Sequence, residues 1–167
     1  KFPEARYVIA GGGTGETYHG ELLSLIAREG IRNVEFCGTL TWEELDPLYR
    51  GASMLVMTSQ EEGDHFEGFV FVFLEAGAYG VPVIGTRTGG IPDAIADGVN
   101  GFLLPADDVE GIARAMIRLA EDPALARSMG MAGRARAEEL TWERYAQQQL
   151  DVYKRVLSGP AARKSGG

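Results

Sequence analysis

Short apolar runs alternate with longer amphipathic stretches along most of the chain. The apolar runs have the length of strands, and the amphipathic stretches carry apolar residues at the spacing of one helix face. The runs that predict strands are 7–10, 34–37, 54–58, 81–86 and 101–104. The stretches that predict helices are 21–29, 42–51, 69–79, 91–96, 109–121, 124–139 and 142–157. This alternation predicts an α/β fold with a parallel sheet, because parallel strands need crossover connections.

Two of the predicted helices carry boundary signals. Thr41 and Glu44 fit a capping box that opens the helix ending near Gly51. Gly80 follows the stretch 69–79 as a C-cap glycine. The phenylalanines and valines of that stretch also suit a strand, so propensity alone leaves its type open.

The loops that follow the strands hold most of the unusual residues. Parallel sheets bind ligands at the carboxyl ends of their strands. We therefore expect the loops after Ala10, Cys37, Thr58 and Thr86 to share one edge of the sheet.

A glycine cluster, Gly11, Gly12 and Gly13, follows the first predicted strand. Such a cluster lets phosphate groups approach the backbone. The dinucleotide fingerprint does not fit, because Glu16 and Tyr18 stand where its third glycine would fall. The P-loop pattern does not fit either, because Glu21 stands where its lysine would fall. A tight turn without a ligand explains the cluster equally well.

Two carboxylates, Glu67 and Glu75, stand eight positions apart at the start of the predicted helix 69–79 and within it. At a rise of about 1.5 Å per residue, they would lie about 12 Å apart along a helix axis. That is comparable to the reach from a sugar across a diphosphate to a ribose. A helix N-terminus near Gly68 would offer unpaired N–H groups to the diphosphate. The alternative is that Glu67 only caps the helix and Glu75 is solvated.

The segment Glu67-Gly-Phe-Val-Phe-Val-Phe-Leu-Glu75 resembles the E-x7-E motif of glycosyltransferase family 4. The elements that usually follow this motif are Gly80-Val-Pro82-Val-Ile84, Thr88-Gly89-Gly90-Ile-Pro92-Asp93 and Asp97-Gly98-Val-Asn-Gly101. The strand and turn Val34-Glu-Phe-Cys-Gly38 and the helix from Trp142 to Tyr153 also resemble this family. The resemblance covers residues 2–157.

The resemblance implies the C-terminal, donor-binding half of a GT-B fold: a doubly wound, Rossmann-like parallel sheet that lacks its first strand-helix unit. It places one nucleotide-sugar-binding domain in residues 1–157. The Gly-, Ser- and Pro-containing tail, residues 158–167, is expected to be disordered. The chain opens without Met, and the Arg and Lys that clamp the diphosphate in the family would lie before Lys1. We therefore expect a truncated chain without the N-terminal domain that holds the acceptor.

The resemblance also implies residue roles. Glu67 faces the donor sugar and is the expected catalytic residue, and Glu75 binds the ribose hydroxyls. The backbone near Leu40 hydrogen-bonds the base. Gly11, Gly12 and Gly13, in the loop after the first predicted strand, are also expected to bind the donor.

The backbone N–H groups of Gly68, Phe69 and Val70 are expected to meet the sugar hydroxyls and the distal phosphate. Val70 departs from the family, which usually has Gly there, and this alters the expected fit of the donor sugar. Asp93 replaces a common Glu with less expected effect. The stretch 61–66 resembles a longer loop of some lipid-acceptor mannosyltransferases.

Composition excludes several classes of protein. A formal net charge of −8 argues against nucleic acid as a partner. The single cysteine, Cys37, excludes an internal disulfide and indicates a reducing, cytoplasmic location. With two histidines and no paired metal-ligand spacing, no zinc site is expected. No apolar run approaches the roughly 20 residues of a membrane span, so any peripheral membrane contact is expected through the missing half only.

The implied activity is retaining transfer of a sugar from a nucleotide-diphospho-sugar, by front-face displacement without a metal or another cofactor. The isolated chain is expected to be inactive, because stabilising the charge of the leaving group is a large catalytic term. The alternatives are a nucleotide-sugar epimerase half and a non-catalytic nucleotide-binding partner of a separate N-terminal chain. A sugar phosphorylase would need a pyridoxal-phosphate lysine, for which Lys154 and Lys164 are poorly placed.

Overall fold

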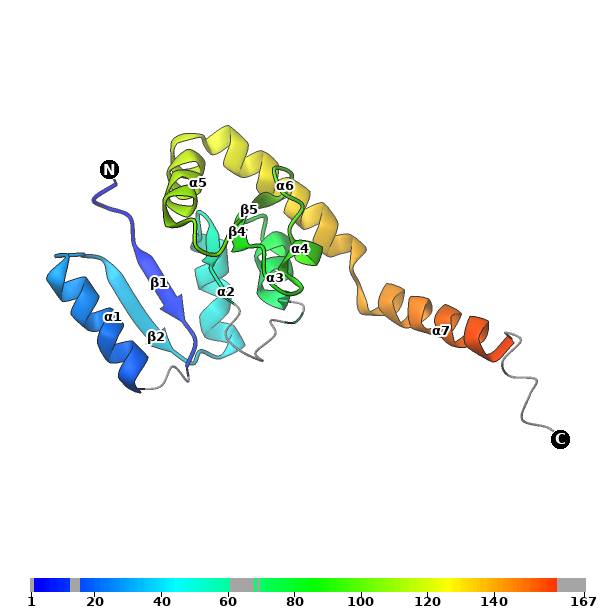
Figure 1. Cartoon of the computed structure of the whole chain (residues 1–167). Helices are drawn as coiled ribbons and strands as arrows, with labels where there is room; N and C mark the ends of the chain where they lie inside the picture. The colour runs from blue at the N-terminus through cyan, green and yellow to red at the C-terminus, as the bar shows by residue number, and fades with distance from the viewer. Residues whose placement is uncertain (1, 13–15, 61–67, 69, 159–167) are drawn as a thin grey trace. The chain divides into compact units, whose positions relative to one another are not determined.

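The computed structural model describes residues 2–12, 16–60, 68 and 70–158, and the chain divides into two compact units, residues 1–48 and residues 49–167. The first unit contains β1 (Tyr7–Ala10), α1 (Glu16–Arg28), β2 (Val34–Gly38) and most of α2 (Trp42–Gly51). The second begins in the last turn of α2. Its further elements are β3 (Leu55–Met57), α3 (Phe71–Ala78), β4 (Val83–Thr86), α4 (Ile91–Ala94), β5 (Gly101–Leu104), α5 (Val109–Glu121), α6 (Pro123–Glu139) and α7 (Trp142–Ser158) (Figure 1).

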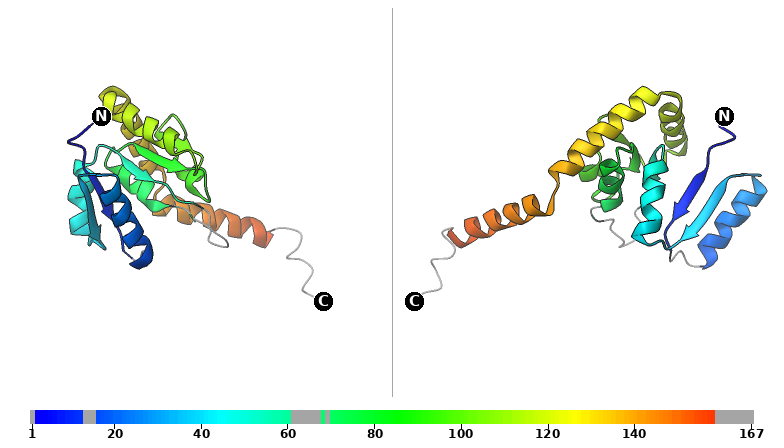
Figure 2. Two further views of the ribbon diagram at one scale, coloured as in Figure 1. Left: turned by 60° about the vertical axis from the view of Figure 1, so that its left-hand side comes forward. Right: turned by 180° about the vertical axis from the view of Figure 1, so that it is seen from behind.

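The first unit is built on a pair of parallel strands, with Tyr7 of β1 opposite Val34 of β2. Helix α1 lies along this pair in each view of the chain (Figure 2). The His19 ring of α1 packs 4.7 Å from the Phe36 ring of β2, centroid to centroid. The α1 crossover thus joins the two parallel strands, as the alternating pattern predicts.

The second unit is built on a three-stranded parallel sheet in the order β3-β4-β5. All four residues of the central strand β4 are buried. Successive residues of a strand point to opposite faces of the sheet. Ile84 packs with Ala115 of α5 and Met129 of α6 on one face. A side chain at Gly85 would point to the other face, against Phe73 of α3 and the Ile91 and Ile95 side chains.

Helices therefore cover both faces of the β3-β4-β5 sheet. This is the doubly wound arrangement, and it explains why β4 reads as a continuous buried run rather than as an alternating one. The α/β class with parallel sheets is confirmed.

Helices α3 and α6 approach one another closely because glycines line their contact (Figure 1). A Cβ atom added to Gly77 of α3 would lie only 2.8 Å from the backbone oxygen of Gly133 in α6. A Cβ atom added to Gly130 would collide with the backbone oxygen of Gly80. These contacts are with rigid backbone, so no side chain can move aside to make room.

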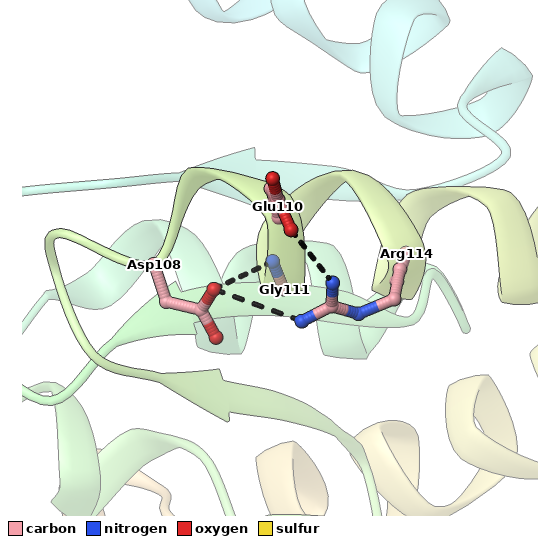
Figure 3. Close-up of polar contacts among 4 residues, drawn as sticks. All are labelled: Asp108, Glu110, Gly111 and Arg114. Carbon is pink, nitrogen blue, oxygen red and sulfur yellow. Dashed lines mark hydrogen bonds and ion pairs between the residues drawn. The ribbon is translucent and has the colours of Figure 1, made fainter.

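Helix α5 begins at a well-defined polar cluster (Figure 3). Asp108 is its N-cap, and the Oδ1 atom accepts a 2.8 Å hydrogen bond from the backbone N–H of Gly111. The Arg114 guanidinium lies 3.8 Å from Asp108 and 3.3 Å from Glu110. Asp122 caps α6 in the same way. The two caps fix where the helices that cover Ile84 begin.

Most element predictions are confirmed, including the bounds of β1, β5 and α5. The ambiguous stretch is a helix, but α3 begins at Phe71 instead of residue 69, with Val70 as its N-cap. β4 begins at Val83 instead of residue 81. The reason is that the Val81 N–H donates to the Ala76 oxygen at the end of α3, and Pro82 has no N–H.

The described strands form two parallel sheets, β1-β2 and β3-β4-β5. The prediction that the four loops share one edge of a single sheet is therefore wrong. Among the described residues, β3 pairs only with β4, and its three residues offer few backbone groups to a second neighbour. The loops after β1 and β2 thus belong to one sheet and those after β3 and β4 to the other.

Ser158, expected in the disordered tail, is the last residue of α7. Residues 159–167 lie outside the described residues, so disorder there stays a prediction. No helix in the described part of the chain is long and apolar enough to cross a bilayer.

The α3–α6 contact gives a first prediction. Gly77→Ala should lower the free energy of unfolding by about 1–3 kcal/mol, because the added methyl group has no space beside the Gly133 backbone. Urea unfolding followed by circular dichroism measures the change. Gly51→Ala at the end of α2, where nothing lies within 4 Å of an added Cβ, is the matched control and should not destabilise. Equal stability of the two variants would contradict the prediction.

Candidate functional site

The loops after β3 and β4 are tied together by threonine hydroxyls. Thr86 Oγ1 donates to the Ser59 carbonyl oxygen at 2.6 Å, and Thr88 Oγ1 donates to the same oxygen at 3.2 Å. Both threonines are buried. At this sheet edge the two loops are therefore adjacent, as expected for the carboxyl ends of neighbouring parallel strands.

The Gly89-Gly90 turn leads from this edge into α4. Gly89 has a φ of +50°, a left-handed conformation that favours glycine. Gly90 is the N-cap of α4, and the Ile91 N–H donates to the Thr88 oxygen at 3.1 Å. The two glycines thus turn the backbone sharply beside the buried threonines.

The start of α3 is displaced from its expected place near Gly68. The helix begins at Phe71, and its N-cap Val70 makes no side-chain capping hydrogen bond. Gly68 is exposed and Val70 is buried, and both precede the helix. Because α3 begins at Phe71, a helical rise cannot be counted from Glu67, and the expected separation of about 12 Å between the two carboxylates stays a prediction. Glu67 and Phe69 themselves lie outside the described residues.

Glu75 lies in the middle of α3 and is half-buried. The Tyr49 hydroxyl, from the last turn of α2, donates to Glu75 Oε2 at 2.7 Å. Burial, and then this hydrogen bond, raise the pKa of the Tyr49 phenol above its usual range. Glu75 is therefore partly solvated and is also hydrogen-bonded to a buried tyrosine.

An aromatic stack supports this hydrogen bond. The Tyr49 and Tyr79 rings are stacked with centroids 5.3 Å apart and an interplanar angle of 15°. The Arg50 guanidinium carbon lies 5.3 Å from the centroid of the Tyr79 ring. Tyr79 is the C-cap residue of α3 and follows Glu75 by four residues, so both side chains reach Tyr49 from the same side of the helix.

The Asp97-Gly98 turn, in one of the segments that usually follow the E-x7-E motif, holds the backbone in place before β5. Asp97 Oδ1 accepts from the Leu103 N–H at 3.0 Å, and Asp97 Oδ2 accepts from Arg87 Nη2 at 2.8 Å. Buried Asn100 accepts from the Ala96 N–H at 2.7 Å. These bonds fix the entry into β5.

The expected donor-binding residues of the first unit lie at the carboxyl ends of β1 and β2. The Gly11 N–H donates to the Gly38 oxygen at 2.8 Å, and Gly11 has a φ of +138°. A Cβ atom added to Gly12 would collide with Thr39 Oγ1. Leu40 follows directly and is half-buried. Gly11 and Gly12 thus meet the loop that contains Leu40, whereas Gly13 lies outside the described residues.

Residues 1–136 match the family model of glycosyl transferases group 1. The chain belongs to this family. A D-inositol 3-phosphate glycosyltransferase of Streptomyces griseus is 39% identical over 153 residues, which are 90% of this chain and 31% of that protein. This group 1 chain therefore spans about a third of the length of that relative.

Similar solved structures identify the fold. The C-terminal domain of a glycosyl transferase group 1 family protein (LpcC) from Francisella tularensis matches with a TM-score of 0.71 and 28% identity, over 81% of this chain and 69% of that one. Anabaena Alr3699/HepE in complex with UDP-glucose matches with a TM-score of 0.78 and 25% identity, over 93% and 42%. The fold is that of the C-terminal half of a GT-B glycosyltransferase, which confirms the expected fold class.

Sequence reasoning missed the tyrosines that hold Glu75. Tyr49 and Tyr79 stand near the ends of two predicted helices, where aromatic residues are read as ordinary packing. Within the described ranges, no three His, Cys, Asp or Glu side chains are grouped so that they could hold a metal ion. A reaction without a metal stays a prediction.

The raised pKa of Tyr49 gives a pH prediction. A raised folded-state pKa contributes stability that is fully present below the unfolded-state value of about 10 and is lost as the pH rises through the folded-state pKa. The stability difference between the native chain and Tyr49→Phe should therefore shrink between about pH 8 and about pH 11. Urea unfolding at both pH values measures it. A difference that does not change with pH would contradict the assignment.

Proposed function

We propose that the chain is the donor-binding part of a retaining glycosyltransferase that transfers a sugar from a nucleotide-diphospho-sugar. The observation that carries this proposal is the Glu75 carboxylate, which a buried tyrosine hydroxyl holds on α3. Glu75 is the second carboxylate of the E-x7-E segment. Membership of the group 1 family gives that segment its context.

Glu75 has the chemistry to bind a ribose. A carboxylate has two acceptor oxygens with about four lone-pair sites, so it can accept hydrogen bonds from two neighbouring hydroxyl groups. The Tyr49 hydroxyl is bound at Oε2, and one donor does not exhaust these sites. The related HepE has been solved with UDP and with UDP-glucose, which supports a nucleotide-sugar as the ligand here.

The start of α3 suits the diphosphate. The first N–H groups of a helix have no partner within the helix, and the positive end of the helix dipole favours an anion there. Val70 provides no side-chain cap at this end. We assign the backbone at Gly68, Phe69 and Val70 to the sugar hydroxyls and the distal phosphate, and Glu67 to the donor sugar.

In the proposed reaction, an acceptor hydroxyl attacks the anomeric carbon from the face that the nucleoside diphosphate leaves. The bond between the anomeric carbon and the phosphate oxygen breaks, and the proton of the acceptor passes to that oxygen. The configuration is retained without a protein nucleophile. The chain's own contribution is to orient the donor and to stabilise the negative charge of the leaving group.

The roles of the two carboxylates predict different losses of affinity. Glu75→Gln should weaken binding of a nucleoside diphosphate by about 1.5–3 kcal/mol, because it removes a charged hydrogen-bond acceptor. Glu67→Gln should spare the nucleoside diphosphate and weaken binding of its sugar conjugate. Titration calorimetry with UDP, GDP and their glucose and mannose conjugates measures both.

A surface variant controls for loss of charge. Glu138 of α6 is exposed and forms an i,i+4 ion pair with Arg134, so Glu138→Gln should leave binding unchanged. If Glu75→Gln and Glu67→Gln bind like this control, the assignment of both carboxylates is wrong.

We further expect the 167-residue chain alone to bind a nucleotide-sugar weakly and to transfer nothing. The chain spans about a third of the D-inositol 3-phosphate glycosyltransferase that it matches, and desolvating a diphosphate needs a second wall around it. Turnover with several nucleotide-sugars should appear only when an N-terminal acceptor domain is supplied, covalently or in trans. Robust transfer by the chain alone would show that the catalytic groups have been misplaced.

A further inference from the structure

Tyr49 joins two helices at the side chain that the proposed function depends on. It comes from the last turn of α2, and its hydroxyl reaches Glu75 Oε2 in the middle of α3 at 2.7 Å. Tyr49 is 8% exposed, so its ring is almost fully covered. A buried tyrosine usually directs its hydroxyl to a partner, and here that partner is the carboxylate of the E-x7-E segment.

The ring of Tyr49 is held in place by the same helix face that carries Glu75. Tyr79 follows Glu75 by one helical turn and stacks on Tyr49 at 5.3 Å and 15°. Arg50 approaches the Tyr79 ring at 5.3 Å. Tyr49 therefore contacts Glu75 of α3 and the C-cap residue Tyr79, one turn apart, and its hydroxyl cannot swing away from Glu75 unless the stack opens.

A carboxylate on a long side chain has a soft final torsion. The last torsion angle of Glu is broad, with no sharply preferred value. Binding two vicinal hydroxyls needs both oxygens in a defined plane, so free rotation would cost binding free energy. A hydrogen bond from a fixed donor to Oε2 sets this plane before the ligand arrives.

We propose that Tyr49 is a positioning residue for nucleotide recognition, whose hydroxyl orients the Glu75 carboxylate toward the two ribose hydroxyls. This inference rests on the proposed ribose-binding role of Glu75. Tyr49 acts through Glu75 and does not touch the ligand. Its contribution is therefore specific to ligands that carry the ribose diol, whereas a purely structural role would affect every nucleotide alike.

Tyr49→Phe tests this proposal, because it removes the hydroxyl and keeps the stacked ring. Calorimetry on the 167-residue chain uses UDP and GDP, each beside its 2′,3′-dideoxy analogue. We expect the variant to bind the ribonucleotide about five- to tenfold more weakly than the native chain does. Its affinity for the dideoxy analogue should stay within about twofold of the native value.

Two controls make the result specific. Tyr153→Phe in α7 makes the same chemical change at an exposed tyrosine and should leave both affinities unchanged. Tyr49→Phe introduced into the Glu75→Gln chain should change affinity by less than about twofold, because the group that Tyr49 orients is already altered.

The outcomes separate this inference from the proposed function. Equal losses for the ribonucleotide and the dideoxy analogue, or no loss for either, would overturn the positioning role even if Glu75→Gln weakens binding. If the folded native chain binds neither UDP nor GDP, the proposed function fails, and the positioning role fails with it.

Discussion

The close approach of α3 and α6 is the constraint on which the rest of the second unit depends. Gly77 and Gly133 bring the two helix backbones together where no side chain would fit. α3 is thereby held against the β3-β4-β5 sheet, with Phe73 under Gly85. Everything that α3 carries, Glu75 included, inherits its position from this backbone contact rather than from the polar groups at the site.

The polar groups then act on a scaffold that is already fixed. The Tyr49 hydroxyl donates to the Glu75 carboxylate of α3, and the Tyr79 ring stacks on the Tyr49 ring. Thr86 and Thr88 hold the loop after β3 beside the loop after β4 through a single carbonyl oxygen, that of Ser59. Apolar packing sets the positions of the elements, and a few buried hydroxyls set the directions of the polar groups around them.

The sequence predicts the fold well where periodicity and caps agree, as for α2, where the Thr41 N–H donates to Glu44 as the capping box predicts. It predicts the fold less well where a backbone hydrogen bond sets the end of an element. The end of α3 and the start of β4 both depend on the Val81 N–H, which donates to the Ala76 oxygen of α3. No residue pattern in the sequence predicts this hydrogen bond. The E-x7-E segment marks Glu75 as a candidate site residue. The hydrogen bond from Tyr49 could not be predicted, because it joins side chains 26 positions apart and no periodic pattern relates residues at that separation.

The junction between α3 and β4 also restricts how this family can change its length. The Gly80 and Val81 N–H groups both end α3, and β4 starts two residues later. An inserted residue that shifted the register of β4 by one would turn Ile84 to the face where Gly85 now admits Phe73, and would leave the opposite core without its central side chain. Insertions in relatives should therefore accumulate in other loops, and this short connection should keep its length through evolution.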